Sequence, residues 1–289
     1  MTSALDLYTR TAEKSAAEVI FAYSSSFGAA SRLLGRRTVK PVRSIYALVR
    51  VADEIVDGVA AVAGLSLEQQ HAALDGLEAQ TLEAIDAGFS TNLVVHAFAA
   101  TARRCGFGAE LVVPFFASMR MDLEPRSLDV EEQRRYVYGS AEVVGLMCVR
   151  VFLTGVSRTA EERERIDAAA CALGAAFQNV NFLRDVGDDA DRLGRDYLPV
   201  EGLEPGPLDE RRKRIWLDRI RADLATADAG IPLLPRDCRR GVALASALFS
   251  ALADRIAATP AEQLRSTRVR VPSAEKARIA ARVLLERRS

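Results

Sequence analysis

The stretch FQNVNFLRDVGDDADRLGRDYLP (residues 177–199) joins two kinds of sequence that seldom occur together. It extends an apolar run, AAACALGAAFQNVNFL (residues 168–183), of the kind found in buried helices. The six residues that follow, RDVGDD (184–189), contain one arginine and three aspartates. A buried helix that ends among carboxylates indicates that a hydrophilic partner lies at its end.

The polar residues of this stretch are spaced so that they share one face of a helix. Four of them fall at positions i, i+3, i+7 and i+11 and form a continuous stripe: Gln178, Asn181, Asp185 and Asp189. Arg184 lies beside the stripe. Burying polar groups costs free energy unless they find partners, and these groups cannot all pair with one another. The stripe therefore predicts a shared hydrophilic ligand.

A second acidic cluster follows the same logic in SIYALVRVADEIVDG (residues 44–58). Arg50, Asp53 and Asp57 stand at i, i+3 and i+7 and share one helix face. The two aspartates are one turn apart, about 6 Å along the helix axis. Apolar residues fill much of the remaining surface of this predicted helix.

Two carboxylate pairs with arginines between them fit hard cations that prefer oxygen ligands. Mg²⁺ takes only one or two carboxylates per ion and keeps water or phosphate ligands, so facing pairs would hold a small cluster of ions against a diphosphate. The arginines would complete the phosphate shell. The alternative is a solvated charged face with Arg–Asp pairs within each helix. Because the same arrangement of arginine and aspartates occurs in two apolar helices, the metal and diphosphate interpretation is favoured.

Composition excludes several other classes of function. Lysine plus arginine and aspartate plus glutamate are equal at 39 each, so no basic field predicts nucleic acid as a partner. The two histidines, His71 and His96, stand in no Glu-x-x-His pair, which argues against a di-iron site. The cysteines form no CxxC pair and are expected to be reduced thiols: Cys105, Cys148, Cys171 and Cys238.

The chain shows a helical period in almost every segment. Ser66 with Gln69, and Thr159 with Glu162, form capping boxes that mark two helix starts. Loops are short and contain proline or glycine, and no segment alternates as a β-strand would. We therefore expect a single all-α domain over residues 1–289 with about eight to eleven helices.

The most apolar segment bears on the location of the protein. GVALASALFSALADRIAA (residues 241–258) meets Asp254 after about 13 residues, whereas a membrane span needs ~20. The N-terminal MTSALDLYTRTAEKS has no apolar core of a signal peptide. We expect a cytoplasmic protein.

Five motifs in this order resemble the squalene/phytoene synthases, which join two isoprenoid diphosphates head to head. They are YSSSFGAASRLL (23–34), IYALVRVADEIVDG (45–58), YVYGSAEVVGLM (136–147), the stretch 177–199 and TRVRVPSAEKARIA (267–280). The resemblance covers nearly the whole chain. Within the family, the motifs are most similar to those of bacterial phytoene synthases. It implies a single-domain isoprenoid-synthase-type helical bundle around a central hydrophobic cavity, and prenyltransferase activity.

The resemblance also implies roles for individual residues. Mg²⁺, roughly two or three ions, would be bound by Asp53, Asp57, Asn181, Asp185 and Asp189. Diphosphate would be contacted by Ser24, Ser26, Tyr46, Arg50, Gln178, Arg184 and Arg268. Tyr136 would lie near the reacting carbons, and with Arg50 and the four aspartates it would form the catalytic set. The small residues Ala141, Val144 and Gly145 would line the hydrophobic tunnel, with ordinary helix packing as the alternative.

Three positions depart from the family pattern. Ser25 stands where some members carry a basic residue between two serines, and Glu54 stands where many have a second aspartate. Phe249 occupies the place of a common tyrosine in the penultimate helix, which puts a role for a second phenol in doubt.

The function implied is the condensation of two geranylgeranyl diphosphates to phytoene through a cyclopropyl diphosphate. The alternative is a C15 enzyme that makes dehydrosqualene, or squalene with NADPH, from farnesyl diphosphate. A non-catalytic assembly factor of the same fold is a third interpretation, which the presence of all four aspartates disfavours. The oily product predicts peripheral contact with the inner membrane face. The oligomeric state is not predicted.

Overall fold

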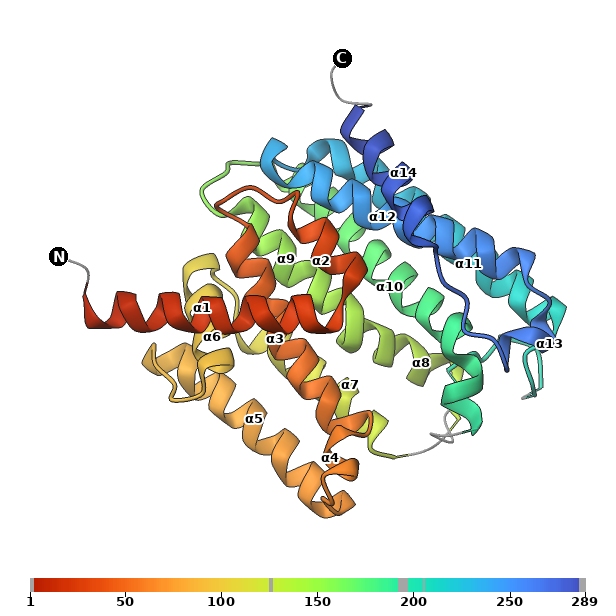
Figure 1. The fold of residues 1–289 in the computed structure, drawn as a ribbon, viewed down its shortest axis with the longest axis horizontal. Helices are drawn as coiled ribbons and strands as arrows, with labels where there is room; N and C mark the ends of the chain where they lie inside the picture. The colour runs from red at the N-terminus through yellow and green to blue at the C-terminus, as the bar shows by residue number, and fades with distance from the viewer. Residues whose placement is uncertain (1–2, 125–126, 192–196, 205, 286–289) are drawn as a thin grey trace.

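The computed structural model describes residues 3–124, 127–191, 197–204 and 206–285, without the side chains at 25–26 and 188–191. Within these residues the chain is helical and contains no β-strand (Figure 1). Its elements are α1 (Ala4–Tyr23), α2 (Ser25–Ser31), α3 (Val39–Val56), α4 (Val59–Val62), α5 (Leu67–Ala87), α6 (Leu93–Cys105), α7 (Ala109–Asp122), α8 (Val130–Val137), η1 (Tyr138–Glu142), α9 (Val143–Leu153), α10 (Ala160–Asp191), α11 (Glu210–Gly230), η2 (Ile231–Leu233), α12 (Arg236–Ala258), α13 (Ala261–Leu264) and α14 (Ser273–Leu285).

The expectation of an all-α chain is confirmed, but the number of helices was underestimated. The described residues form 14 α-helices because the turns α2, α4 and α13, of seven residues or fewer, were not recognised. Both predicted capping boxes are present. Ser66 and Gln69 open α5, and the backbone N–H groups of Thr159 and Glu162 each bind the other's side chain, at 3.0 and 3.1 Å.

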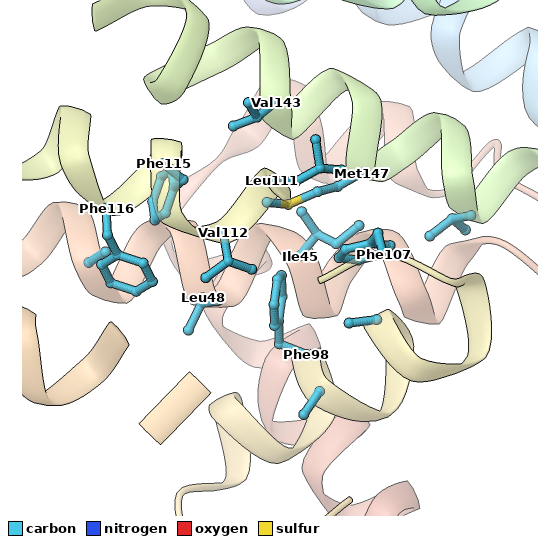
Figure 2. Packing of buried hydrophobic residues seen from close by; sticks show 14 of the residues in the cluster. Ile45, Leu48, Phe98, Phe107, Leu111, Val112, Phe115, Phe116, Val143 and Met147 are labelled. Atoms are coloured by element: carbon cyan, nitrogen blue, oxygen red, sulfur yellow. The ribbon is translucent and has the colours of Figure 1, made fainter. Parts of the chain in front are cut away.

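Two hydrophobic clusters form the core. The first lies among α3, α5, α6, α7 and α9, where Phe98, Phe115 and Met147 are almost fully buried (Figure 2). The second lies among α8, α10, α11, α12 and α14 and is centred on Trp216 and Leu183. Helix α10 contributes to both clusters and, at 32 residues, is the longest described helix.

Glycines allow the central helices to approach at backbone distance. A Cβ added at Gly145 would lie 2.6 Å from the carbonyl oxygen of Ala170, and one at Gly174 would lie 2.6 Å from that of Ala141. A Cβ on Gly139, in the π-helical turn η1, would lie 2.2 Å from the Pro114 carbonyl oxygen. Helices α7, α9 and α10 therefore pack closely around the middle of the molecule.

Two described segments are long and apolar enough to cross a membrane by length and composition alone, Val130–Leu153 and Arg236–Ala258. About half of the most apolar window of each is buried inside the molecule, 56% and 44%. Both supply residues to the central clusters, as core helices of a globular protein do. All four cysteines are free thiols.

Candidate active site

A cavity of about 1010 Å³ lies between α2, α3, α9, α10, α12 and the segment that leads into α14. Its two ends differ in chemistry. The end of α3, the second half of α10 and the C-terminal segment supply its charged lining residues, among them Arg50, Asp53, Arg184 and Arg268. Helix α9, the first half of α10 and η2 supply apolar or small residues. The cavity therefore has one polar and one apolar end.

Most of the residues predicted for the site lie on the wall of this one cavity. They are Ser24, Tyr46, Arg50, Asp53, Tyr136, Ala141, Val144, Gly145, Gln178, Asn181, Arg184 and Arg268. Asp57 and Asp185 are not lining residues but interact with Asp53, Arg184 and Arg268, which are. The side chains of Ser26 and Asp189 lie outside the described residues. The polar stripe and the first acidic cluster are thus brought together from helices more than 100 residues apart.

The first acidic cluster lies in the last turns of α3. Arg50 binds Asp53 with 2.5 Å between Nη1 and Oδ2, and it also pairs with Glu54. Asp53 and Asp57 are close enough to share a hydrogen bond. Burial raises the pKa of the Asp53 carboxyl to about 8, and the charge of Asp57 adds to this effect. Burial and the Asp57 charge therefore outweigh the effect of Arg50, and the charged form of Asp53 is unfavourable unless a further cation binds.

The second acidic cluster connects α10 to the C-terminal segment. Asp185 accepts a hydrogen bond from Arg184 Nε at 2.9 Å and binds Arg268 Nε at 3.0 Å. A Cβ on Gly187 would lie 1.9 Å from the carbonyl oxygen of Arg265, so only glycine allows the C-terminal segment to approach α10 this closely. The Arg–Asp pairs of the alternative interpretation are present, but their arginines face the cavity.

The donor groups fit a hard divalent cation. The Oδ1 atom of Asn181 is buried, lies on the stripe that faces the cavity, and has no hydrogen-bond partner among the described residues. Together with the Asp53–Asp57 pair it offers the oxygen ligands that Mg²⁺ prefers. Among the described residues no three His, Cys, Asp or Glu side chains converge to hold a metal alone. Water or diphosphate oxygens would have to complete the coordination, which is the usual situation for Mg²⁺.

A buried carboxylate that sequence analysis missed binds the predicted Tyr136. Asp122, the last residue of α7, is 4% exposed and accepts hydrogen bonds from Tyr136 at 2.8 Å and from Tyr197 at 2.5 Å. Burial, and then the negative charge of Asp122, raise the pKa of Tyr136 well above its usual value, so the phenol stays neutral. The sequence signal was a lone aspartate that ends an apolar helix, AELVVPFFASMRMD.

The aromatic wall of the cavity explains the position of Phe249. Its ring stacks on Phe177 with 3.9 Å between centroids and lies 5.5 Å from Phe27. All three rings line the cavity. The described structure therefore places a hydrocarbon ring, and no phenol, at this point of the wall.

Comparison with known proteins decides what class of enzyme has this cavity. The family model described as Squalene/phytoene synthase matches residues 20–275. The chain belongs to the squalene/phytoene synthase family. Members of this family are prenyltransferases, so the chain is an enzyme of that class. The family in general binds isoprenoid diphosphates and depends on divalent metal ions.

Curated relatives within this squalene/phytoene synthase family are named phytoene synthases. The 15-cis-phytoene synthase of Paracoccus sp. is 33% identical over 251 residues, which cover 83% of this chain and 80% of the relative. The phytoene synthase of Rhodobacter capsulatus is 34% identical over 257 residues, which cover 83% and 71%.

Solved structures of the family confirm the fold. A dehydrosqualene synthase in complex with a ligand superposes with a TM-score of 0.75 and 22% identity, over 96% of both chains. The squalene synthase HpnC from Alicyclobacillus acidocaldarius superposes with a TM-score of 0.69 and 22% identity, over 86% of this chain and 94% of its own. At this level of identity the likeness concerns the fold alone.

Proposed function

We propose that this chain catalyses the Mg²⁺-dependent head-to-head condensation of two geranylgeranyl diphosphates to phytoene, through a cyclopropyl diphosphate. The observation that carries the proposal is a cavity lined by arginines and Asp53 at one end and by an apolar wall along the rest. Its substrates would have a charged head and a long hydrocarbon tail. The phytoene synthase names of relatives at about a third identity support the C20 substrate.

Diphosphate binding is assigned to the polar end. Arg50, Arg184 and Arg268 would donate charge-assisted hydrogen bonds to phosphate oxygens, supported by Ser24, Ser26, Tyr46 and Gln178. Two of the three arginines now bind Asp185 and the third binds Asp53, so substrate binding would exchange these partners. Mg²⁺, held by Asp53, Asp57, Asn181, Asp185 and Asp189, would supply positive charge to the leaving diphosphate.

The chemistry then follows from the placement of charge. The C–O bond of the first substrate ionises to an allylic cation and diphosphate, and the arginines bind the released anion. The double bond of the second substrate attacks the cation and, with loss of a proton, gives the cyclopropyl diphosphate. A second ionisation, rearrangement and proton loss give the linear product. Tyr136 lies on the cavity wall, where we place the reacting carbons.

The apolar end would protect the cations from water. Phe177, Phe249 and Val144 are among the apolar residues of the cavity wall, and they offer no nucleophile. The same surface would orient the two hydrocarbon chains, since it excludes water from the space between them. Ala141 and Gly145 keep this wall thin, because they pack against α10 at backbone distance.

We further propose that residues 1–289 form one domain and that the protein is cytoplasmic with peripheral membrane contact at the inner face. Support for a single domain comes from α10, which belongs to both core clusters. Support for membrane contact comes from the exposed apolar segment at α4, where Val62 is 90% exposed and Val59 55%.

The test is incubation of the purified protein with Mg²⁺ and either the C15 or the C20 all-trans diphosphate, with and without NADPH, followed by mass analysis of a hexane extract. We expect a C40 hydrocarbon from the C20 substrate without NADPH. A C30 product would assign the chain to the dehydrosqualene or squalene branch, and NADPH dependence would choose between these two. No hydrocarbon from either substrate, with the fold intact, would contradict the proposal and favour an assembly factor.

A further inference from the structure

We propose that Asp122 is a positioning residue that fixes the hydroxyl group of Tyr136 at the cavity wall, with Tyr197 as the second donor that holds the carboxylate in place. This inference rests on the proposed function, because it assigns Tyr136 to the wall beside the reacting carbons. It concerns a residue outside the acidic motifs. The carboxylate accepts hydrogen bonds from two phenols, of which Tyr197 lies 75 residues away in the chain.

The three side chains form a buried network. Tyr136, Tyr197 and Asp122 are 4%, 6% and 4% exposed, respectively. The Tyr136 hydroxyl donates to Oδ2 of Asp122 at 2.8 Å, and the Tyr197 hydroxyl donates to Oδ1 at 2.5 Å. Each carboxylate oxygen thus has its own phenol. The residues come from α7, α8 and the segment after α10, so the network joins three separate elements.

Aromatic packing restricts the two phenols further. The rings of Tyr136 and Tyr197 lie 5.0 Å apart between centroids, and Tyr197 stacks on Phe182 at 4.4 Å with 9° between planes. Phe182 also contacts Tyr136, at 5.8 Å. Because the Tyr136 ring packs at a tilt against both aromatic neighbours and its hydroxyl group is hydrogen-bonded, the Tyr136 oxygen has little freedom to move. Tyr136 lines the cavity, whereas Asp122 and Tyr197 stand behind it.

The direction of the hydrogen bond decides what Tyr136 can offer to the cavity. A tyrosine hydroxyl has one proton to donate, and here that proton is given to Asp122. The oxygen therefore keeps only lone pairs for a partner in the cavity. A negative carboxylate behind it increases the electron density on this oxygen, and the effect is strong where water is excluded. A fixed, electron-rich oxygen suits a wall beside a developing carbocation and would be a poor donor to diphosphate.

The energetic cost of the arrangement argues against a purely structural role. A buried carboxylate requires strong compensation. Asp122 also adds negative charge to a region that already holds Asp53 and Asp57, and it contributes to the raised pKa of Asp53. An apolar or amide side chain at this position would join the same elements without that repulsion. The effect of Asp122 on Tyr136 is a role that requires its negative charge.

The decisive experiment is a double-mutant cycle between Asp122→Asn and Tyr136→Phe, read as kcat and KM of hydrocarbon formation. Asparagine has nearly the shape of aspartate but carries no charge. We expect Asp122→Asn to lower kcat by about 10- to 100-fold, the scale of one charge-assisted hydrogen bond, with KM within threefold. In the Tyr136→Phe background the same change should cost less than twofold. Equal losses in both backgrounds, or an unchanged kcat, would overturn the proposal.

A second readout does not depend on activity. The protein has six tyrosines, and labelling with ¹³Cζ-tyrosine makes the hydroxyl environment of each visible by NMR. The signals of Tyr136 and Tyr197 are assigned by their loss in the Tyr136→Phe and Tyr197→Phe variants. We expect Asp122→Asn to move these two signals and to leave the other tyrosine signals in place. If Asp122→Asn does not fold, Tyr197→Phe should move the Tyr136 signal, because the carboxylate then loses one of its two phenol donors. A Tyr136 signal that stays in place in the folded variants overturns the proposal.

The two readouts also separate this inference from the proposed function. If the wild-type protein forms no hydrocarbon from either diphosphate, the proposed function fails while the NMR experiment still tests whether Asp122 holds Tyr136. If hydrocarbon forms and the cycle is additive, the proposed function stands and the positioning role of Asp122 fails.

Discussion

The charged form of Asp53 is unfavourable in the folded protein, and a bound cation would stabilise it. Its carboxyl is partly buried beside Asp57, and burial raises its pKa to about 8. Without a metal the charged form is therefore unfavourable in the folded state, although Arg50 binds it. A residue kept in such a position stabilises the fold less than a neutral amide of the same shape would. Its value lies in the ligand that it attracts.

The corresponding prediction is that Asp53→Asn separates activity from stability. We expect the rate of hydrocarbon formation to fall at least ~100-fold, as for the loss of a metal ligand. The melting temperature in EDTA should stay the same or rise slightly, because the amide removes an unfavourable buried charge. Rates and melting curves of the two proteins give the answer, and a variant rate within threefold of wild type would refute the assignment.

Asp223 on α11 predicts a pH dependence that is unrelated to the site. Burial raises its pKa to about 6 in the folded state, against an ordinary value of 3.8. The folded state therefore binds this proton more tightly, and wild-type stability falls as the pH rises from about 4 to about 6. Asp223→Asn cannot undergo this loss. Its melting temperature relative to wild type should rise over that interval and stay level above it.

A matched control for this measurement lies on the same helix. Asp218 has a side chain that is 67% exposed, so Asp218→Asn measures the effect of removing a solvent-exposed carboxyl group from this helix. A difference between Asp223→Asn and wild type that is independent of pH would show that the Asp223 carboxyl does not titrate as described.

At the scale of elements, the position of the C-terminal segment depends on one glycine of α10. Gly187→Ala would place a Cβ 1.9 Å from the carbonyl oxygen of Arg265 and push the segment away. We expect a loss of about 1–3 kcal/mol in unfolding free energy, typical of overpacking. Binding of inorganic diphosphate, measured by calorimetry with Mg²⁺, should weaken as well, because Arg268 would move away from the cavity wall.

Gly76→Ala in α5 is the control for that substitution. A Cβ there meets nothing within 4 Å, so alanine should leave diphosphate binding unchanged and stabilise the helix by up to about 1 kcal/mol. Equal diphosphate affinity for Gly187→Ala and wild type would show that the close approach of α10 and the C-terminal segment does not position Arg268.

Features within a single helix could be predicted from the sequence, whereas contacts between separate elements could not. Capping boxes and the stripe of Gln178 and Asn181 depend on residues within one helix, so spacing alone was enough to find them. The contact between Asp122 and Tyr197 joins residues 75 positions apart and depends on where the segment after α10 meets the end of α7. No local pattern encodes such a contact. Short turns such as α4 were missed for a similar reason, since four residues cannot establish a period.

On the scale of the whole molecule, the cavity brings together polar and apolar side chains from several helices. Its polar end is built from α3, α10 and the segment before α14, which no short motif relates to one another. The sequence predicted that two acidic clusters face a common ligand, because neither could satisfy its charges alone. The extent of the apolar end could not be predicted, since it depends on the packing of η2 and α9 against α10.

The exposed apolar segment at α4 leads to a prediction about where the whole molecule works. Val59, Val62 and Leu67 are 55%, 90% and 51% exposed, and they follow directly after Asp57 of the first acidic cluster. No charged residue occurs from Gly58 to Leu67, so this segment can enter a lipid interface at low cost. We expect Val62→Asp to reduce partitioning onto lipid vesicles roughly tenfold, the scale of removing one buried valine from an apolar environment.

Leu7→Asp provides the control for membrane binding, because Leu7 is 60% exposed and belongs to α1, whose N-terminal end lies away from α4 (Figure 1). Sedimentation of each variant with vesicles, and its kcat in detergent, separate binding from chemistry. If α4 is the contact, Val62→Asp loses vesicle binding and keeps its kcat in detergent, while Leu7→Asp keeps both. Equal binding by Val62→Asp and wild type would exclude α4 as the contact, and a similar loss in both variants would point to general apolar adsorption.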